Sequence, residues 1–276
     1  MTCVIPVENI NYWRHPSLAG IELSQAKFTH FSFDKHVHLD YHLGVVTQGA
    51  QQFVNKGCSY QLGQQSLSTL NPDETHDGQS CYAEGYCVNV MSIPVAYMNE
   101  ISQELGIKEH FFSAPMVDDP RLYHYFTQLH EQLIQGQFSE LASESHLLYF
   151  LHLLLQRHPA QAIKLSPQQG LSPLQLNVIK QRIHDEPWQN TQLATLATEV
   201  NLSKFQFLRQ FKQATGMTPH AYLKRLRLEL AKKSLSRGVL VADVAQQLGF
   251  FDQSHLNKAF KHAFLLSPVQ FQRRML

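Results

Sequence analysis

The sequence predicts an α+β protein with a β-rich N-terminal half and an all-helical C-terminal half. Three observations support this prediction: short alternating apolar runs up to about residue 92, a helical unit that recurs at a fixed offset, and a reversal of charge between the halves. Residues 1–170 hold 8 Lys and Arg against 16 Asp and Glu, whereas residues 171–276 hold 15 against 6. The basic C-terminal half therefore suits an anionic partner, whereas the acidic N-terminal half would repel one.

Turn-forming residues divide the first 92 residues into short strands. Alternating runs at 41–47 and 66–70 are typical of half-buried strands. Many short strands at close spacing predict a sandwich or a barrel. The predicted turns are Gln48-Gly49, Asn55-Lys56-Gly57, Asn71-Pro72-Asp73 and Asp77-Gly78.

Histidines gather in this β region. On one regular strand, His36, His38, Asp40 and His42 would project from the same face, with His76 on a neighbouring strand. Imidazole and carboxylate are the usual ligands of Fe, Mn and Zn, so a metal site is one interpretation. We favour a pocket in which the histidines hydrogen-bond a ligand. An exposed polar face opposite the apolar residues remains the third interpretation.

From Ile93 the pattern becomes helical. Helices are expected at 95–105, closed by Gly106, at 120–134, and at 138–157. The third helix carries apolar side chains on more than one face, which indicates contact with a second subunit or burial within the chain, and we favour a dimer. His158-Pro159 ends it. A polar stretch follows, so we predict an N-terminal domain over 1–165, a linker over 166–172 and a C-terminal domain over 173–276.

The basic half contains a duplicated helical unit with an offset of 49 residues. Helices are expected at 174–185, after a cap at Thr191, after a cap at Ser203, and as one long helix at 219–235. The second copy has Gly249 at its turn and Asp252 as its cap. Matching pairs are Ser203 and Asp252, Phe207 and Leu256, Arg209 and Lys258, Phe211 and Phe260, and Pro219 and Pro268.

The composition limits the cellular compartment in which the protein is expected. The sequence has no apolar run of 18 residues and does not begin with a basic stretch followed by an apolar block, so neither a membrane span nor a signal peptide is expected. Its four cysteines form no CxxC pair, which indicates reduced thiols in a cytoplasmic protein. No cofactor is predicted.

The run from Asp243 to Lys261, followed by Ser267-Pro268, resembles the C-terminal signature of the AraC/XylS family of transcription regulators, as do 211–219 and 227–231. The first half resembles the cupin domain of these regulators, through His36-Val37-His38, the Gly49 turn, Gly63, and Asn71-Pro72 before His76. The glutamate of cupin metal motifs is absent from 41–46.

The resemblance implies a cupin-like β-barrel with following helices, and two helix-turn-helix units joined by a long helix. It implies a ligand-responsive activator, not an enzyme, that forms homodimers and contacts promoter DNA, RNA polymerase and a small-molecule effector. Two recognition helices about 34 Å apart would enter successive major grooves. Rival interpretations are a cupin metalloenzyme fused to a DNA-binding module, and a ligand-free dimerisation cupin.

Residue roles follow from the two recognition helices. We expect Arg209 to contact guanine, and Phe205 and Leu208 to meet thymine methyls or the sugar-phosphate edge. The buried positions Phe207, Phe211, Leu256 and Phe260 are structural. The second unit has Phe264-Leu265 in place of Thr215-Gly216, so its helix is expected to end by another geometry. The further groove-facing residues are Gln253, Ser254, Asn257 and Lys258, the phosphate contacts are Lys204, Lys212, Lys261, Arg273 and Arg274, and the effector-binding residues are His36, His38, His42 and His76.

Overall fold

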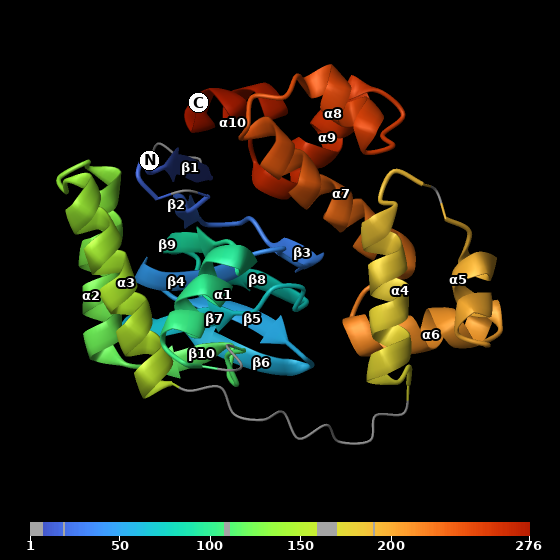
Figure 1. Cartoon of the computed structure of the whole chain (residues 1–276), viewed down its shortest axis with the longest axis horizontal. Helices are drawn as coiled ribbons and strands as arrows, with labels where there is room; N and C mark the ends of the chain where they lie inside the picture. Colours follow the sequence, from blue (N-terminus) through green and yellow to red (C-terminus); the bar gives the residue numbers. More distant parts are fainter. Residues whose placement is uncertain (1–7, 19, 108–110, 159–169, 190) are drawn as a thin grey trace. The chain divides into compact units, whose positions relative to one another are not determined.

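The computed structural model of the protein describes residues 8–18, 20–107, 111–158, 170–189 and 191–276. The chain folds into two compact units, residues 1–34 with 38–163, and residues 164–276 with 35–37. Strands fill the N-terminal part and helices the C-terminal part (Figure 1), which confirms the predicted fold class. The predicted linker at 166–172 lies largely outside the described residues, so the exact domain boundary stays a prediction.

The strands form two sheets. The larger has the order β1-β2-β9-β4-β7-β10 and the smaller has the order β3-β8-β5-β6. The strands of the larger sheet pair antiparallel throughout. The bounds are β1 Asn9–Arg14, β2 Glu22–Phe28, β3 Phe33–His36, β4 Tyr41–Gln48, β5 Gln51–Asn55, β6 Cys58–Leu62, β7 Ser66–Leu70, β8 His76–Ser80, β9 Tyr86–Ile93 and β10 Met116–Asp118.

The core lies between the larger sheet and three helices: α1 (Val95–Glu104), α2 (Pro120–Ile134) and α3 (Glu140–Arg157). Pairing register places Leu23 opposite Met91 and Met91 opposite Leu43, so one fully buried apolar row crosses three strands. Each such side chain contributes roughly 1.5–3 kcal/mol when it leaves water. Burial of this row fixes the register in which the strands pair, because a shift by one residue would move the row to the other face of the sheet.

Two details of the β region differ from the sequence prediction. The expected turn at Asp77-Gly78 lies inside β8, where the Asp77 carboxylate accepts a hydrogen bond from the Val54 amide at 2.7 Å. The short strand β10 lies between the first two expected helices, where no strand was predicted, and pairs with β7. Both differences arise from long-range strand pairing, which local turn and helix signals do not contain.

The helices α2 and α3 are joined at one end through Asp119. Its Oδ1 accepts a hydrogen bond from the Leu122 amide at 3.2 Å and caps α2, while Arg157 Nε donates to Oδ2 at 2.7 Å from the end of α3. Burial opposes ionisation of Asp119, yet the hydrogen bonds from Arg157 and His158 hold the pKa of its carboxyl below the usual value. The carboxylate therefore stays charged and ties the two helices together.

The C-terminal helices match the predicted order closely, and the caps at Ser203 and Asp252 are confirmed. Thr191 is not a cap, because the next helix begins at Leu193 after Gln192. None of the helices in the described ranges is both long and apolar enough to cross a membrane. The bounds are α4 Pro173–Asp185, α5 Leu193–Glu199, α6 Lys204–Thr215, α7 Pro219–Leu235, α8 Val241–Gln247, α9 Gln253–Phe264 and α10 Pro268–Met275.

The two recognition helices end in the same way, contrary to the sequence prediction. Gly216 closes α6 with a φ of 72°, and Leu265 closes α9 with a φ of 61°, both left-handed. A left-handed conformation costs a non-glycine residue roughly 1–2 kcal/mol. The Leu265 amide still donates to the Lys261 carbonyl at 2.9 Å, and the buried Phe264 and Leu266 on either side hold this exit in place.

His130 of α2 makes the β domain sensitive to acid. Its buried ring donates from Nε2 to the Val90 carbonyl at 3.1 Å, and burial lowers the pKa of the ring to about 4. In the unfolded chain this ring titrates near its ordinary pKa of about 6.5, so the unfolded state binds the proton first as pH falls. We predict that neutral His130 makes its full contribution to the free energy of unfolding above about pH 6.5. About 3 kcal/mol of this free energy is lost when the pH falls to 4.

Urea unfolding of the wild type and of His130→Leu, at a series of pH values from 7.5 to 4, measures this contribution. The variant should lose less stability over that range, because its unfolded state has no corresponding proton to bind. His124→Leu is the matched control, since His124 is exposed on the same helix. Equal pH dependence in the wild type and His130→Leu would contradict the prediction.

Candidate DNA-binding helices and histidine cluster

The helix α6 is fixed by a cap at one end and by a buried aromatic face. Ser203 Oγ accepts from the Gln206 amide at 3.3 Å, and Gln206 Oε1 accepts from the Ser203 amide at 3.1 Å, which completes a capping box. Phe207 and Phe211 are fully buried, one turn apart. The remaining face is thereby directed to solvent.

That exposed face holds the residues predicted from the sequence. Phe205 is 86% exposed although it is aromatic, and Arg209 is exposed one turn further along. Leu208 is half-buried at the edge of the face. The cations Lys204 and Lys212 are also exposed. An apolar side chain left in solvent beside an arginine and two lysines is typical of a contact surface rather than of a solvated helix.

The helix α9 repeats this arrangement with different side chains. Asp252 Oδ1 accepts from the His255 amide at 2.6 Å, and Leu256 and Phe260 are fully buried. Among the predicted groove residues, Asn257 is half-buried and the others are exposed. Arg273 and Arg274, predicted to meet phosphates, are exposed on α10. The predicted DNA-contacting residues of α9 that are exposed are Gln253, Ser254, Lys258 and Lys261.

Two exposed aromatics near these helices were not predicted. Phe251, 92% exposed, lies directly before the cap of α9, and Trp188 is half exposed in the loop that precedes α5. The sequence signal for Phe251 is the Gly249-Phe250-Phe251 run, in which only Phe250 is buried. The residue that matches Phe251 at the 49-residue offset is Leu202, which is half-buried. Comparison of the two units therefore does not indicate that Phe251 is exposed.

Arg227 of α7 joins the two helix-turn-helix units. Its Nε donates to the Pro187 carbonyl at 2.6 Å, Nη2 to the Gln189 carbonyl at 3.1 Å and Nη1 to the Gly249 carbonyl at 3.1 Å. The first two acceptors lie in the loop before α5, and the third lies in the turn of the second unit. We call these four residues the Arg227 clamp. The clamp connects the two helix-turn-helix units directly, in addition to the covalent link through α7.

Arg227 is not the only buried cation among the described residues of α7. Arg225, Arg227 and Lys232 are all buried. Arg225 pairs with Glu229 at 2.6 Å, and Lys232 lies 5.4 Å from the centre of the Phe264 ring. The helices α6, α8, α9 and α10 all pack against α7, so it has little solvent-facing surface left for its charges.

The histidine cluster consists of His36, His38, His42 and His76. The rings of His38 and His42 stack with their centres 3.6 Å apart, and those of His38 and His76 lie 5.1 Å apart. Ligand nitrogens of His36, His38 and His76 all lie within 4.8 Å of one another. The structure thus brings together the four histidines predicted to bind an effector. Asp40 is not part of the three-residue group that could hold a metal.

The route by which these histidines meet differs from the prediction. They do not follow one strand, because β3 ends at His36 and β4 begins only at Tyr41. His42 belongs to the larger sheet, whereas His36 and His76 belong to neighbouring strands of the smaller sheet. The cluster therefore spans the two sheets and depends on their packing.

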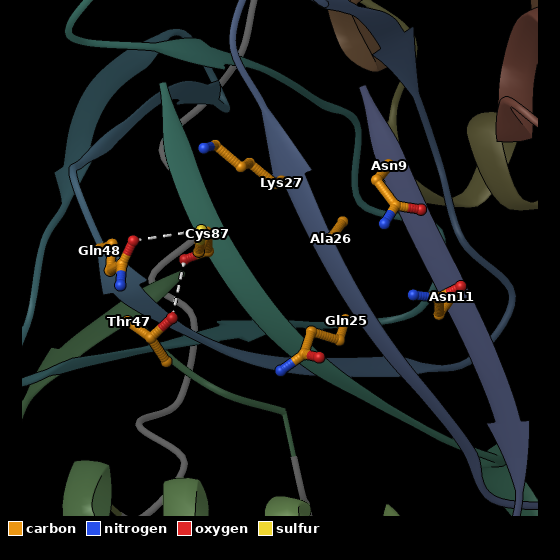
Figure 2. Close-up of a pocket in the computed structure, with 8 residues that line it drawn as sticks. All are labelled: Asn9, Asn11, Gln25, Ala26, Lys27, Thr47, Gln48 and Cys87. Atoms are coloured by element: carbon orange, nitrogen blue, oxygen red, sulfur yellow. Dashed lines mark hydrogen bonds between the residues drawn. The ribbon is translucent and has the colours of Figure 1, made fainter. Parts of the chain in front are cut away.

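A separate depression lies on the larger sheet, and its lining contains none of the cluster histidines (Figure 2). Its lining is mostly polar and uncharged, with the apolar Ala26 and the charged Lys27 as exceptions. Thr47, at a register shift in β4, donates to the Cys87 carbonyl at 3.5 Å, and Cys87 Sγ lies 3.7 Å from Gln48 Oε1. The lining residues are Asn9, Asn11, Gln25, Ala26, Lys27, Thr47, Gln48 and Cys87.

Both halves of the chain match known families. Residues 18–151 match an AraC-like ligand binding domain, and residues 196–274 match a helix-turn-helix domain. The HTH-type transcriptional regulator YbfI of Bacillus subtilis (strain 168) is 30% identical over 233 residues, which cover 81% of each chain. The chain belongs to the AraC family of transcription regulators. It is therefore a DNA-binding transcription regulator with a ligand-binding domain.

Two further relatives extend along most of this AraC-family chain. The transcriptional activator RhaS of Enterobacter sp. (strain 638) is 26% identical over 251 residues, which cover 88% of each chain. A crystal structure of apo ToxT from Vibrio cholerae strain SCE256 superposes with a TM-score of 0.60 at 15% identity, covering 98% of this chain and 97% of ToxT. That likeness shows that the two proteins share a fold.

The Arg227 clamp predicts an unusual sensitivity at Gly249. A Cβ atom there would lie 2.3 Å from the Trp188 carbonyl oxygen, and the φ of 70° adds strain. We predict that Gly249→Ala lowers the free energy of unfolding by more than about 2 kcal/mol and weakens DNA binding, because the second turn must leave the loop before α5.

Gly238→Ala is the matched control in the same helical part. Its φ of 86° is also left-handed, but a Cβ would meet only the Leu276 side chain at 3.8 Å, an ordinary contact. Only backbone strain of roughly 1–2 kcal/mol is expected. Urea unfolding and DNA titration of both variants compare the two sites, and equal losses would argue against a tight contact at Gly249.

Proposed function

We propose that α6 and α9 read promoter DNA and that a small-molecule effector bound at the histidine cluster changes how they do so. The single observation behind the DNA-reading role is that both helices bury one aromatic or aliphatic face and expose cations and short polar side chains on the other. The major groove of DNA is wide enough for one such helix. The basic charge of residues 171–276 supplies the non-specific part of the affinity.

Within this proposal the two helices have unequal tasks. Arg209 on α6 presents an exposed guanidinium, which matches the two acceptors of guanine. Phe205 and Leu208 beside it suit thymine methyl groups. On α9, Gln253, Ser254, Asn257 and Lys258 offer hydrogen bonds to base edges. Lys204, Lys212 and Lys261, with Arg273 and Arg274, suit phosphates.

The effector site rests on the chemistry of the histidine cluster. Neutral imidazole both donates and accepts hydrogen bonds, so four rings between two sheets can orient a small polar or anionic molecule. ToxT, which shares the fold, has been crystallised with an unsaturated fatty acid and with (E)-4-(8-methylnaphthalen-1-yl)but-3-enoic acid. Both are small organic acids, which supports a small acidic ligand for this chain as well.

Several further properties belong to the proposal. We infer a homodimer through α3, where Leu141 is 75% exposed and Tyr149 is half exposed. RhaS is named an activator, which supports activation and contact with RNA polymerase here. The protein would act in the cytoplasm, where promoter DNA is found, and regulation rather than catalysis would be its activity.

Arg209→Ala tests the DNA-reading role. We predict that affinity for the selected binding site falls about tenfold to a hundredfold, because one bidentate guanine contact is worth roughly 1–3 kcal/mol. Affinity for random DNA should change little. Fluorescence anisotropy on a site obtained by in vitro selection measures both. Arg237→Ala, an exposed arginine outside the two recognition helices, is the control, and equal effects of the two variants would refute the assignment.

The sensing role is tested with the same DNA assay in the presence of small acids and other metabolites. A true effector should change affinity for the selected site in the wild type and in His124→Gln, and this change should be lost in His42→Gln. Calorimetry on the DNA-free protein measures effector binding directly. If every compound that binds the cluster leaves the affinity for DNA unchanged, the sensing role is refuted. The domain would then act only as a scaffold.

A further inference from the structure

We propose that His36, His38 and His76 bind one divalent transition-metal ion of the zinc and cobalt type. The inference goes beyond effector sensing, since it concerns the metal alone. Among the residues that the structure describes, this is the group of histidine, cysteine and acidic side chains whose ligand atoms come close enough to share an ion. Distance, protonation, burial and donor type each support such a site.

The distances are those of a site that closes around a metal with small side-chain adjustments. The three ligand nitrogens lie within 4.8 Å of one another. Zinc binds imidazole nitrogen at about 2.0–2.1 Å in a tetrahedron, which places neighbouring nitrogens roughly 3.3 Å apart. Closing from the observed spacing requires shifts of about an ångström, which imidazole rings achieve by rotation about their side-chain bonds.

The tautomer of His76 is already the one that a metal needs. Its Nδ1 lies 3.0 Å from the backbone carbonyl oxygen of Glu74. A carbonyl oxygen only accepts, so Nδ1 carries the proton in the neutral ring and Nε2 is the nitrogen able to bind a metal. Metal-bound histidines almost always donate their second ring nitrogen to a carbonyl or carboxylate in this way. The outer contact of the site is therefore built into the loop before β8.

Burial and strand pairing fix two of the three ligands. His36 and His76 are only 8% and 6% exposed, and they lie at the end of β3 and the start of β8, which are neighbours in the smaller sheet. His38 follows two residues after His36. Ligands held on paired strands lose little conformational freedom when an ion binds, which favours affinity.

The donor set selects the kind of ion. Three imidazoles suit zinc, cobalt, nickel, copper or iron, whereas magnesium, calcium and manganese prefer oxygen ligands. The nearby Glu74 carboxylate is engaged with Lys56 at 2.5 Å. Three protein ligands also leave a position for a water or an exchangeable ligand.

Cobalt is the probe for the experiment, because tetrahedral Co²⁺ absorbs visible light and Zn²⁺ displaces it silently. The full-length protein is stripped with a chelator and titrated with Co²⁺, without DNA or metabolite. We expect one Co²⁺ per chain, visible absorption, full displacement by one equivalent of Zn²⁺, and a rise in the melting temperature. Less than one bound ion per chain, or binding without these bands, would overturn the proposal.

The variants His38→Gln and His76→Gln locate the ion. Each should lower Co²⁺ affinity at least about a hundredfold, and His124→Gln, exposed on α2, should bind as the wild type does. Melting temperatures of the metal-free proteins show whether each variant folds, and the wild-type titration decides the existence of the site if one does not. Wild-type affinity in both cluster variants would refute the assignment. Because no DNA is present, a negative result leaves the proposed regulation intact.

Discussion

The arrangement of the helical half depends on one buried guanidinium. Arg227 gives hydrogen bonds to three backbone carbonyls that come from two separate turns. Removing an arginine from water costs several kcal/mol unless its donors are satisfied, so this position tolerates few geometries. The loop before α5 and the turn before α9 must therefore stay together. These contacts add to α7 a second connection between the two helix-turn-helix units.

The β domain follows a comparable logic with strand register in place of a charge. The row of Leu23, Met91 and Leu43 commits one face of the larger sheet to the helices. The alternate side chains of these strands lie on the opposite face, where Phe28 contacts Phe33 of the smaller sheet. His42 comes from the larger sheet and His76 from the smaller, so the fold itself creates the meeting point of the histidines. The same cluster serves both the effector proposal and the metal proposal.

Sequence patterns predicted those features whose physical cause is local. The bounds of α2 and α7 agree with the predicted ranges, because helical spacing, an N-terminal proline and a cap lie within the segment itself. The strand β10 and the β8 path through Asp77-Gly78 were missed, because a partner strand decides them. Leu265 was misjudged for a related reason: the packing of Phe264 and Leu266 overrides the preference for glycine.

The amino-acid order alone determines three properties of this protein. They are the opposite charge of the two halves, the duplicated unit with its caps, and the composition of the exposed helix faces. These properties depend on spacing and residue type, which are complete in the chain before it folds. Which charges are buried and which histidines meet depends instead on tertiary packing. Arg227 and His76 find their partners across about 20 to 40 residues or between sheets, and such contacts form only when whole elements pack together.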